Sequence, residues 1–306
     1  MNRYEDHPSF GEGELRAQIN RVAAVHDISC LGRCALTVII PVLSAMGVQT
    51  VPLPTALLST HTGGFKDMFF ADLTGHMGEI SAHWKSIGTD FDAIYSGFLG
   101  SYEQIDMLER FIKDFSLKND GKRAFIAVDP VMGDDGELYF TYDNDLMLGM
   151  SRLCYGADLI TPNLTEACFL LSEKYPAHTP KKEEAMEMAG YLSKRLTEEF
   201  GCKKAVITGI PAVGDDRSGI MISAAIEDTG EPCFHSVPLM PRSYPGTGDV
   251  FASVLLGEML LQKDFKRSVA FASDFVCRIT ELSQHYRTPI RDGLVIEPYL
   301  SMLMDR

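Results

Sequence analysis

A short glycine-rich segment near the C-terminal end of the chain carries the residues best suited to chemistry. Pro245 is followed by Gly246, Thr247, Gly248 and Asp249, and an apolar stretch with helical spacing comes next. Two glycines allow a sharp turn, and the free N–H groups at a helix start attract an anion. The Asp249 carboxylate could accept a proton from a hydroxyl beside that anion. The segment predicts phosphoryl transfer; the alternative is an aspartate that only caps the helix.

Acidic residues also follow other predicted strands. Asp129 and Asp134 flank a turn that contains Gly133, and Glu166 lies three residues after Asn163, in an expected first helical turn. Carboxylates that meet at one edge of a sheet suit a Mg²⁺ ion that keeps most of its waters. We therefore predict that Asp129, Asp134 and Glu166 order this metal. The alternatives are a turn-forming role for Asp129 and a helix-capping role for Glu166.

One of the eight histidines lies in a loop that could fold over a ligand. His61 and Thr62 come directly before Gly63 and Gly64. We predict a ligand contact for His61; the alternative is a histidine that holds the backbone of the loop. We interpret His26 as an interior side chain.

These residues need a scaffold, and the hydrophobic pattern predicts one. Short apolar segments alternate with longer amphipathic ones, which is typical of an α/β protein with a mainly parallel sheet and helices on both faces. Such a sheet binds ligands outside the carboxyl ends of its strands, where the polar segments lie. Pro41 predicts a kink or a late start in its helix. The predicted strands are 22–25, 48–53, 93–95, 124–128, 158–160, 205–208 and 219–226, and the predicted helices are 34–46, 73–87, 102–115, 181–200, 249–261 and 265–284.

Composition narrows the classes of function. The chain has 306 residues, of which 45% are hydrophobic and 23% charged, as in globular proteins. A net charge of −14 argues against a nucleic-acid surface and against docking on an anionic membrane. Seven cysteines without a CxxC motif indicate reduced thiols, and no apolar run reaches the length of a membrane span. We expect a cytoplasmic protein with an N-terminal extension over 1–20 and one domain over 21–306.

Several well-known motifs are absent from the sequence. It contains no GxxxxGK[ST] phosphate-binding loop, no protein-kinase HRD or DFG motif and no GxSxG nucleophile segment. No GxGxxG follows the first predicted strand, which argues against a nicotinamide cofactor. Any phosphate chemistry must therefore depend on a different loop.

Taken in order over residues 21–285, the motifs resemble those of the ribokinase superfamily, and within it the pyridoxal kinase family. The matching segments are Leu58–Gly63, Asp129–Asp134, Ile160–Glu166 and Gly246–Asp249. The resemblance implies a single-domain ribokinase-like fold. It also implies ATP-dependent phosphorylation of the 5'-hydroxymethyl group of a B6 vitamer, and a homodimer.

The resemblance also implies a role for each site residue. The catalytic group would comprise the base Asp249 and the anion hole of Gly246, Thr247 and Gly248. The substrate would contact Asp27, His61, Thr62 and Phe98. The nucleotide and its phosphates would lie near Asp129, Thr161, Asn163, Thr208 and Gly209, while Asp129, Asp134 and Glu166 would order Mg²⁺. A monovalent cation, K⁺ or Na⁺, would lie near Thr161, Thr208, Gly246 and Thr247.

Two residues depart from the mammalian-type pattern of this family. Asp27 stands where that pattern has Ser, and Phe98 stands where it has Tyr. A carboxylate beside the ring would favour a protonated pyridine nitrogen or a charged amine. No cysteine occurs in 241–245, so a lid thiol that traps the aldehyde is not supported.

Three functions stay open at this point. The first is a B6-vitamer kinase, and the second is a kinase of the same fold that acts on hydroxymethylpyrimidine or a sugar. The third is a non-catalytic protein that binds the vitamin. Neither the preferred vitamer nor the oligomeric state follows from the sequence.

Overall fold

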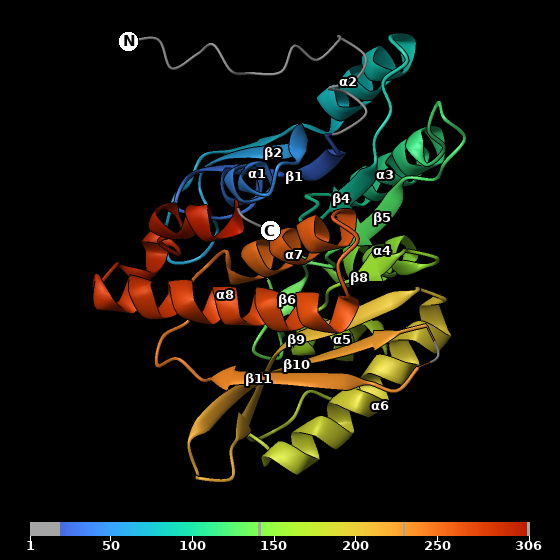
Figure 1. Ribbon diagram of the computed structural model, residues 1–306. Coiled ribbons are helices and arrows are strands. Elements are labelled where there is room, and N and C mark those ends of the chain that lie inside the picture. The colour runs from blue at the N-terminus through green and yellow to red at the C-terminus, as the bar shows by residue number, and fades with distance from the viewer. Residues whose placement is uncertain (1–18, 140–141, 229, 305–306) are drawn as a thin grey trace, which may run out of the picture.

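A nine-stranded sheet organises the molecule (Figure 1). The computed structural model describes residues 19–139, 142–228 and 230–304. The strand order across the sheet is β11-β10-β9-β8-β5-β4-β1-β2-β3. These strands are β1 (Arg21–Leu31), β2 (Gln49–Thr60), β3 (Phe70–Asp72), β4 (Ala93–Ser96), β5 (Phe125–Val128), β8 (Leu159–Ile160), β9 (Lys204–Val213), β10 (Gly219–Glu227) and β11 (Cys233–Pro238), and a separate hairpin pairs β6 (Gly133–Asp134) with β7 (Glu137–Leu138).

The middle of the sheet is parallel. Strands β2, β1, β4, β5, β8 and β9 pair in parallel, while β3 on one edge and β10 and β11 on the other are antiparallel. All carboxyl ends of the parallel strands therefore meet at one edge. The predicted α/β class with a mainly parallel sheet is confirmed.

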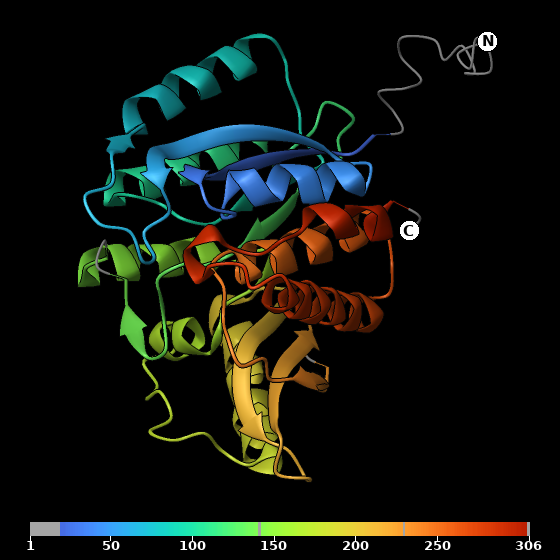
Figure 2. The same cartoon turned by 90° about the vertical axis from the view of Figure 1, so that its left-hand side faces the viewer.

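Helices cover both faces, and each face has its own hydrophobic core (Figure 2). Alternate residues of β1 supply the two cores: Ala23 and Val25 pack on one side, Val22 and Ala24 on the other. One face carries α2 (Thr74–Ser86), α3 (Tyr102–Phe115), α4 (Asn144–Cys154), α5 (Leu164–Leu170) and α6 (Lys182–Phe200), and the other carries α1 (Leu36–Ala45), α7 (Thr247–Leu260) and α8 (Phe265–His285). Two 3-10 helices, η1 (Ile290–Asp292) and η2 (Glu297–Leu303), end the described chain.

The structure extends several predicted elements and adds others. Helix α1 begins late, at Leu36, and runs through Pro41. Strand β2 continues to Thr60, well past the predicted 48–53. Strands β3 and β11, the β6–β7 hairpin and helix α4 were not predicted, whereas the helical turn expected at Glu166 is the first turn of α5. Most of the predicted 1–20 extension lies outside the described residues.

Within the described residues, no helix has both the length and the apolar character that crossing a bilayer would require.

Candidate active site

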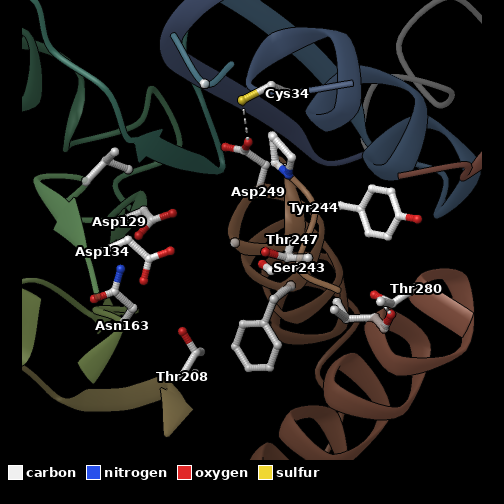
Figure 3. Close-up of a pocket in the computed structure, with 18 of the residues that line it drawn as sticks. Cys34, Asp129, Asp134, Asn163, Thr208, Ser243, Tyr244, Thr247, Asp249 and Thr280 are labelled. Carbon is white, nitrogen blue, oxygen red and sulfur yellow. Dashed lines mark hydrogen bonds between the residues drawn. The ribbon is translucent and has the colours of Figure 1, made fainter. Parts of the chain in front are cut away.

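A cavity of about 730 Å³ opens at the carboxyl edge of the parallel strands (Figure 3). All fifteen residues that the sequence predicts for the site line this cavity. They are Asp27, His61, Thr62, Phe98, Asp129, Asp134, Thr161, Asn163, Glu166, Thr208, Gly209, Gly246, Thr247, Gly248 and Asp249. Segments that are more than 200 residues apart in the sequence thus converge on one space.

Asp249 lies in the first turn of α7, and a neighbouring segment fixes its orientation. The backbone N–H of Ala35 donates to Asp249 Oδ2 at 2.8 Å, and the Cys34 thiol donates to the same oxygen at 3.5 Å (Figure 3). Ala35 reaches this position with a φ of 51°, which is uncommon for a residue other than glycine. Burial raises the pKa of Asp249 above its ordinary value. A carboxylate held in this way has one oxygen left to accept a proton.

The residue before α7 must be glycine. Gly246 has a φ of 87°, and a Cβ at this position would lie 2.2 Å from the carbonyl oxygen of Arg33. The first N–H bonded within the helix is that of Val250, which donates to Gly246 O. The N–H groups of 247–249 are therefore the orphan donors of a helix start, which face the cavity edge as an anion site.

Acidic residues form the facing wall (Figure 3). Asp129 and Glu166 are 6% and 3% exposed, and burial raises the pKa of both carboxyl groups. Asp134 is exposed on the β6–β7 hairpin. The described residues contain no cluster of three or more His, Cys, Asp or Glu side chains that would itself hold a metal ion. The donors fit an ion that takes one or two carboxylates and completes its shell with water and phosphate oxygens.

Glu166 and Asn163 form the capping box of α5. The Asn163 side chain accepts from Glu166 N at 2.9 Å, and Glu166 Oε2 accepts from Asn163 N at 2.8 Å. Glu166 Oε1 accepts from Met132 N, and the Asn163 amide donates to Gly133 O. The capping alternative is therefore confirmed for Glu166. Its metal role stays a prediction, as does the nucleotide contact of Asn163, whose amide is already bonded to the protein.

The remaining predicted nucleotide residues follow β8 and lie within β9. Thr161 is buried at the end of β8, while Thr208 is half-buried and Gly209 is exposed. Gly209 has a φ of 68°, so the strand changes direction at the cavity. The positions fit the predicted contacts, which stay predictions.

Both ring nitrogens of His61 are bonded to the protein backbone. Nδ1 accepts from the N–H of Gly63 at 3.0 Å, so Nε2 carries the proton and donates to Arg291 O at 2.7 Å. The ring also fills the space beside Gly32, where a Cβ would lie 2.4 Å from His61 Cδ2. These bonds favour the alternative of a histidine that holds the loop. His61 lines the cavity, but neither of its ring nitrogens is left to bond a ligand.

Three predicted substrate residues lie on the same side as His61. Asp27 is buried near the end of β1, Thr62 is half-buried in the loop after β2, and Phe98 is half-buried after β4. The Phe98 ring contacts Tyr142 edge-on, with 6.1 Å between centroids. This side therefore offers one aromatic face and two polar groups.

The sequence analysis missed the opposite end of the cavity. It is mostly apolar and lies between strands β10–β11 and helices α7–α8. Its lining includes Met221, Val237, Leu239, Phe251, Val276 and Cys277, together with the hydroxyl residues Ser223, Ser273 and Thr280. The sequence signal that could have revealed this end is the strand β11, but the strand is short and its alternation of apolar and polar residues is weak. An apolar crevice of this kind suits a planar aromatic ring.

The segment before α1 is joined to the C-terminal part of the chain, which the sequence analysis also missed. Arg33 N donates to Asp292 O at 3.3 Å, and the Arg33 guanidinium donates to Asp292 O at 3.2 Å and to Glu297 at 2.7 Å. Gly293 packs against this segment with a φ of 73°, and a Cβ there would lie 2.8 Å from Arg33 N. We call residues 289–297 the C-terminal brace.

Solved structures resemble this fold over nearly its full length. A candidate phosphomethylpyrimidine kinase from Bacteroides thetaiotaomicron, crystallised with pyridoxal, is 38% identical; the match covers 94% of this chain and 96% of that one, with a TM-score of 0.83. Pyridoxal kinase from Lactobacillus plantarum is 28% identical and covers 94% and 97%, with a TM-score of 0.81. The ribokinase-like fold expected from the motifs is confirmed.

Curated relatives and family models agree with this likeness. A candidate pyridoxal kinase of Saccharomyces cerevisiae is 25% identical over 206 residues, which span 65% of this chain and 61% of that relative. The model of the phosphomethylpyrimidine kinase family matches residues 40–290. With its fold, its glycine-rich helix start and its acidic wall in the expected order, the chain belongs to the phosphomethylpyrimidine kinase family, whose relatives include pyridoxal kinases.

Proposed function

We propose that this protein is an ATP-dependent kinase that phosphorylates the 5'-hydroxymethyl group of a B6 vitamer. One observation carries the proposal: Asp249 and the free N–H groups at the start of α7 face the same cavity as Asp27, Thr62 and Phe98. A base, an anion site and an acceptor pocket are therefore contiguous. The Bacteroides relative crystallised with pyridoxal, at 38% identity, supports a B6 vitamer as the acceptor.

The chain's own residues supply the chemistry of the acceptor. Asp249 Oδ2 is occupied by Ala35 N–H and the Cys34 thiol, so Oδ1 accepts the proton of the substrate hydroxyl as it attacks the γ-phosphoryl group. The N–H groups of Thr247 and Gly248 stabilise negative charge on the transferred group. The loop that His61 holds shields this centre from water.

Asp129, Asp134 and Glu166 would hold Mg²⁺ together with its waters. Bound there, the ion would neutralise phosphate charge, which this cavity needs because its described lining has six carboxylates and Arg242 as its cationic side chain. A monovalent cation would lie near Thr161, Thr208, Gly246 and Thr247. Exchanging Glu166→Gln should raise the Mg²⁺ concentration needed for half-maximal rate, and an unchanged Mg²⁺ titration would remove Glu166 from this role.

The test is ADP release with ATP and Mg²⁺ and each of pyridoxal, pyridoxamine and pyridoxine, with the 5'-phosphate product identified by mass spectrometry. We expect kcat/KM for at least one vitamer to exceed that for hydroxymethylpyrimidine or a sugar by tenfold or more. A higher value for hydroxymethylpyrimidine would support the second candidate, which the family model favours. Binding of a vitamer without ADP release would instead indicate a non-catalytic binder.

A further inference from the structure

The Asp27 carboxylate occupies an irregular position in the sheet. The pairing of β1 with β2 shifts register between His26 and Ile28, because β1 advances by two residues there while β2 advances by three, so the extra residue of β2 lies opposite Asp27. The Asp27 side chain lines the cavity although it is only 6% exposed. Ser29 Oγ donates to Asp27 Oδ2 at 2.7 Å and fixes the orientation of the carboxylate. The other oxygen, Oδ1, has no side-chain partner among the described residues.

No cation compensates this buried carboxylate in the described surroundings. The ionisable groups that face it are Asp249 of α7, Cys34 before α1 and Tyr142 before α4, and all three are acids. The adjacent His26 is neutral, because burial lowers its pKa to about 3. Burial and the Asp249 charge together raise the pKa of Asp27 to about 6, while the Ser29 hydrogen bond opposes them. An unpaired buried carboxylate is costly, so it favours either a proton or a cation from outside the chain.

The groups beside Asp27 indicate which chemical features a ligand must have to bind here. Both ring nitrogens of His61 are bonded to backbone, so among the four predicted substrate residues the polar side-chain atoms without a protein partner are Asp27 Oδ1 and the Thr62 hydroxyl. The Phe98 ring beside them supplies an apolar face for an aromatic ligand. What the Asp27 carboxylate lacks among the described residues is a positively charged partner.

We propose that Asp27 is a specificity-determining residue that pairs with a positively charged nitrogen on the acceptor substrate. This inference rests on the proposed function for the identity of the acceptor. The nitrogen is either the protonated ring nitrogen, which every B6 vitamer can present, or the ammonium group that pyridoxamine alone carries. In either case the acceptor is bound as a cation, and a neutral ring of the same shape is bound less tightly.

The experiment compares the wild-type enzyme with Asp27→Asn, which keeps the shape and removes the charge. Asp135→Asn is the matched control, because it removes one negative charge from the exposed rim of the same cavity. For each vitamer, KM and kcat are measured with saturating ATP and Mg²⁺, and the dissociation constant is measured by calorimetry without ATP. Ultraviolet absorption of the bound vitamer reports the protonation of its ring.

We expect Asp27→Asn to raise the KM and dissociation constant of the cationic acceptor about 10- to 100-fold, the usual range for losing a bond to a charged group. The kcat should change less than threefold, and Asp135→Asn should behave as wild type. Weakened binding of pyridoxamine alone identifies the ammonium group. Weakened binding of all vitamers, with a shift of bound pyridoxine to the spectrum of the neutral ring, identifies the ring nitrogen.

The outcomes separate this inference from the proposed function. If the wild type phosphorylates the vitamers and Asp27→Asn leaves every KM and dissociation constant within twofold, the role of Asp27 is overturned and the kinase stands. If the wild type binds vitamers without turnover, the proposed kinase activity falls, while the calorimetric comparison still decides the role of Asp27. If the wild type binds none of them, both are overturned. A melting temperature near that of wild type for Asp27→Asn excludes misfolding as the cause.

Discussion

The two ends of the cavity are built differently. At the acceptor end, Asp249 is held by two hydrogen bonds from the segment before α1, and His61 by one bond within its own loop and one to the C-terminal brace. At the other end, between β10–β11 and α7–α8, the lining is mostly apolar side chains such as Val276 and Leu239. Directional bonds fix geometry to a fraction of an ångström, whereas apolar contact tolerates small shifts. The acceptor end should therefore control rate and selectivity, and the apolar end should contribute affinity.

The largest effect should come from removing the base at the acceptor end. Asp249→Asn should lower kcat about 10²–10⁴-fold, the usual scale for losing a positioned base. Asp145→Asn is the control, because Asp145 also lies in the first turn of a helix but is exposed on α4. Steady-state kinetics with the preferred vitamer measure both. A fall of less than threefold in a folded Asp249→Asn protein would remove Asp249 from this role.

The close approach of two segments at the acceptor end gives the next test. Gly246 and Gly47 both have positive φ, at 87° and 76°, but a Cβ at Gly246 meets Arg33 O whereas Gly47 has open space around it. Gly47→Ala should cost about 1–2 kcal/mol of unfolding free energy and leave the activity intact. Gly246→Ala should cost about 1–3 kcal/mol more and lower kcat/KM about 100-fold. Denaturant titration and kinetics compare the pair, and equal effects would contradict the argument.

The buried histidine beside Asp27 should make the acceptor end sensitive to acid. Burial lowers the pKa of His26 to about 3 from 6.5, so the unfolded chain binds a proton between these values while the folded chain does not. Stability should fall as the pH drops below 6.5, by about 2–3 kcal/mol at pH 4.5. His26→Gln should remove this part of the loss, whereas His83→Gln, exposed on α2, should keep it. Urea unfolding across this pH range is the measurement.

The smallest effect should come from the apolar end. We expect the adenine ring of ATP in this crevice, because its mostly apolar lining suits a planar aromatic ring. Val276→Ala removes two methyl groups from the lining and should raise the KM for ATP about five- to tenfold, with kcat within twofold. Val213→Ala, on an exposed part of β9 outside the cavity, should change neither constant. If Val276→Ala instead lowered kcat for the vitamer and left the KM for ATP unchanged, the division between the two ends would be wrong.

The sequence predicted which residues converge on one cavity better than it predicted the elements around them. Glycine-rich and acidic motifs follow strands whose carboxyl ends must meet, so the convergence of Asp129, Thr208 and Asp249 follows from the class of the sheet. The predicted strand ends at residue 53 because Pro54 follows it, whereas β2 contains both Pro52 and Pro54 and continues to Thr60. Strand β3 pairs only with residues 56–58 of β2, so at both prolines β2 pairs with β1 alone and forms the edge of the sheet. An edge strand tolerates proline because one side of it needs no backbone N–H donor.

Contacts that depend on backbone atoms escaped prediction for a physical reason. Ala35 acts through its N–H, which no side-chain motif reveals, and His61 bonds to a carbonyl 230 residues away in the chain. A histidine in a glycine-rich loop has the same sequence pattern whether its ring nitrogens face a ligand or a backbone. Only the positions of Gly63 N and Arg291 O distinguish the two.

The C-terminal brace also bears on the order in which the molecule is completed. Arg33 leaves the ribosome long before its partner Asp292, which is 259 residues further along the chain. A nascent chain that ends before residue 289 can contain every strand of the sheet and still lack the bonds that hold the wall around Asp249. Translation therefore completes the strands of the sheet before it supplies the bonds that fasten the segment beside Asp249.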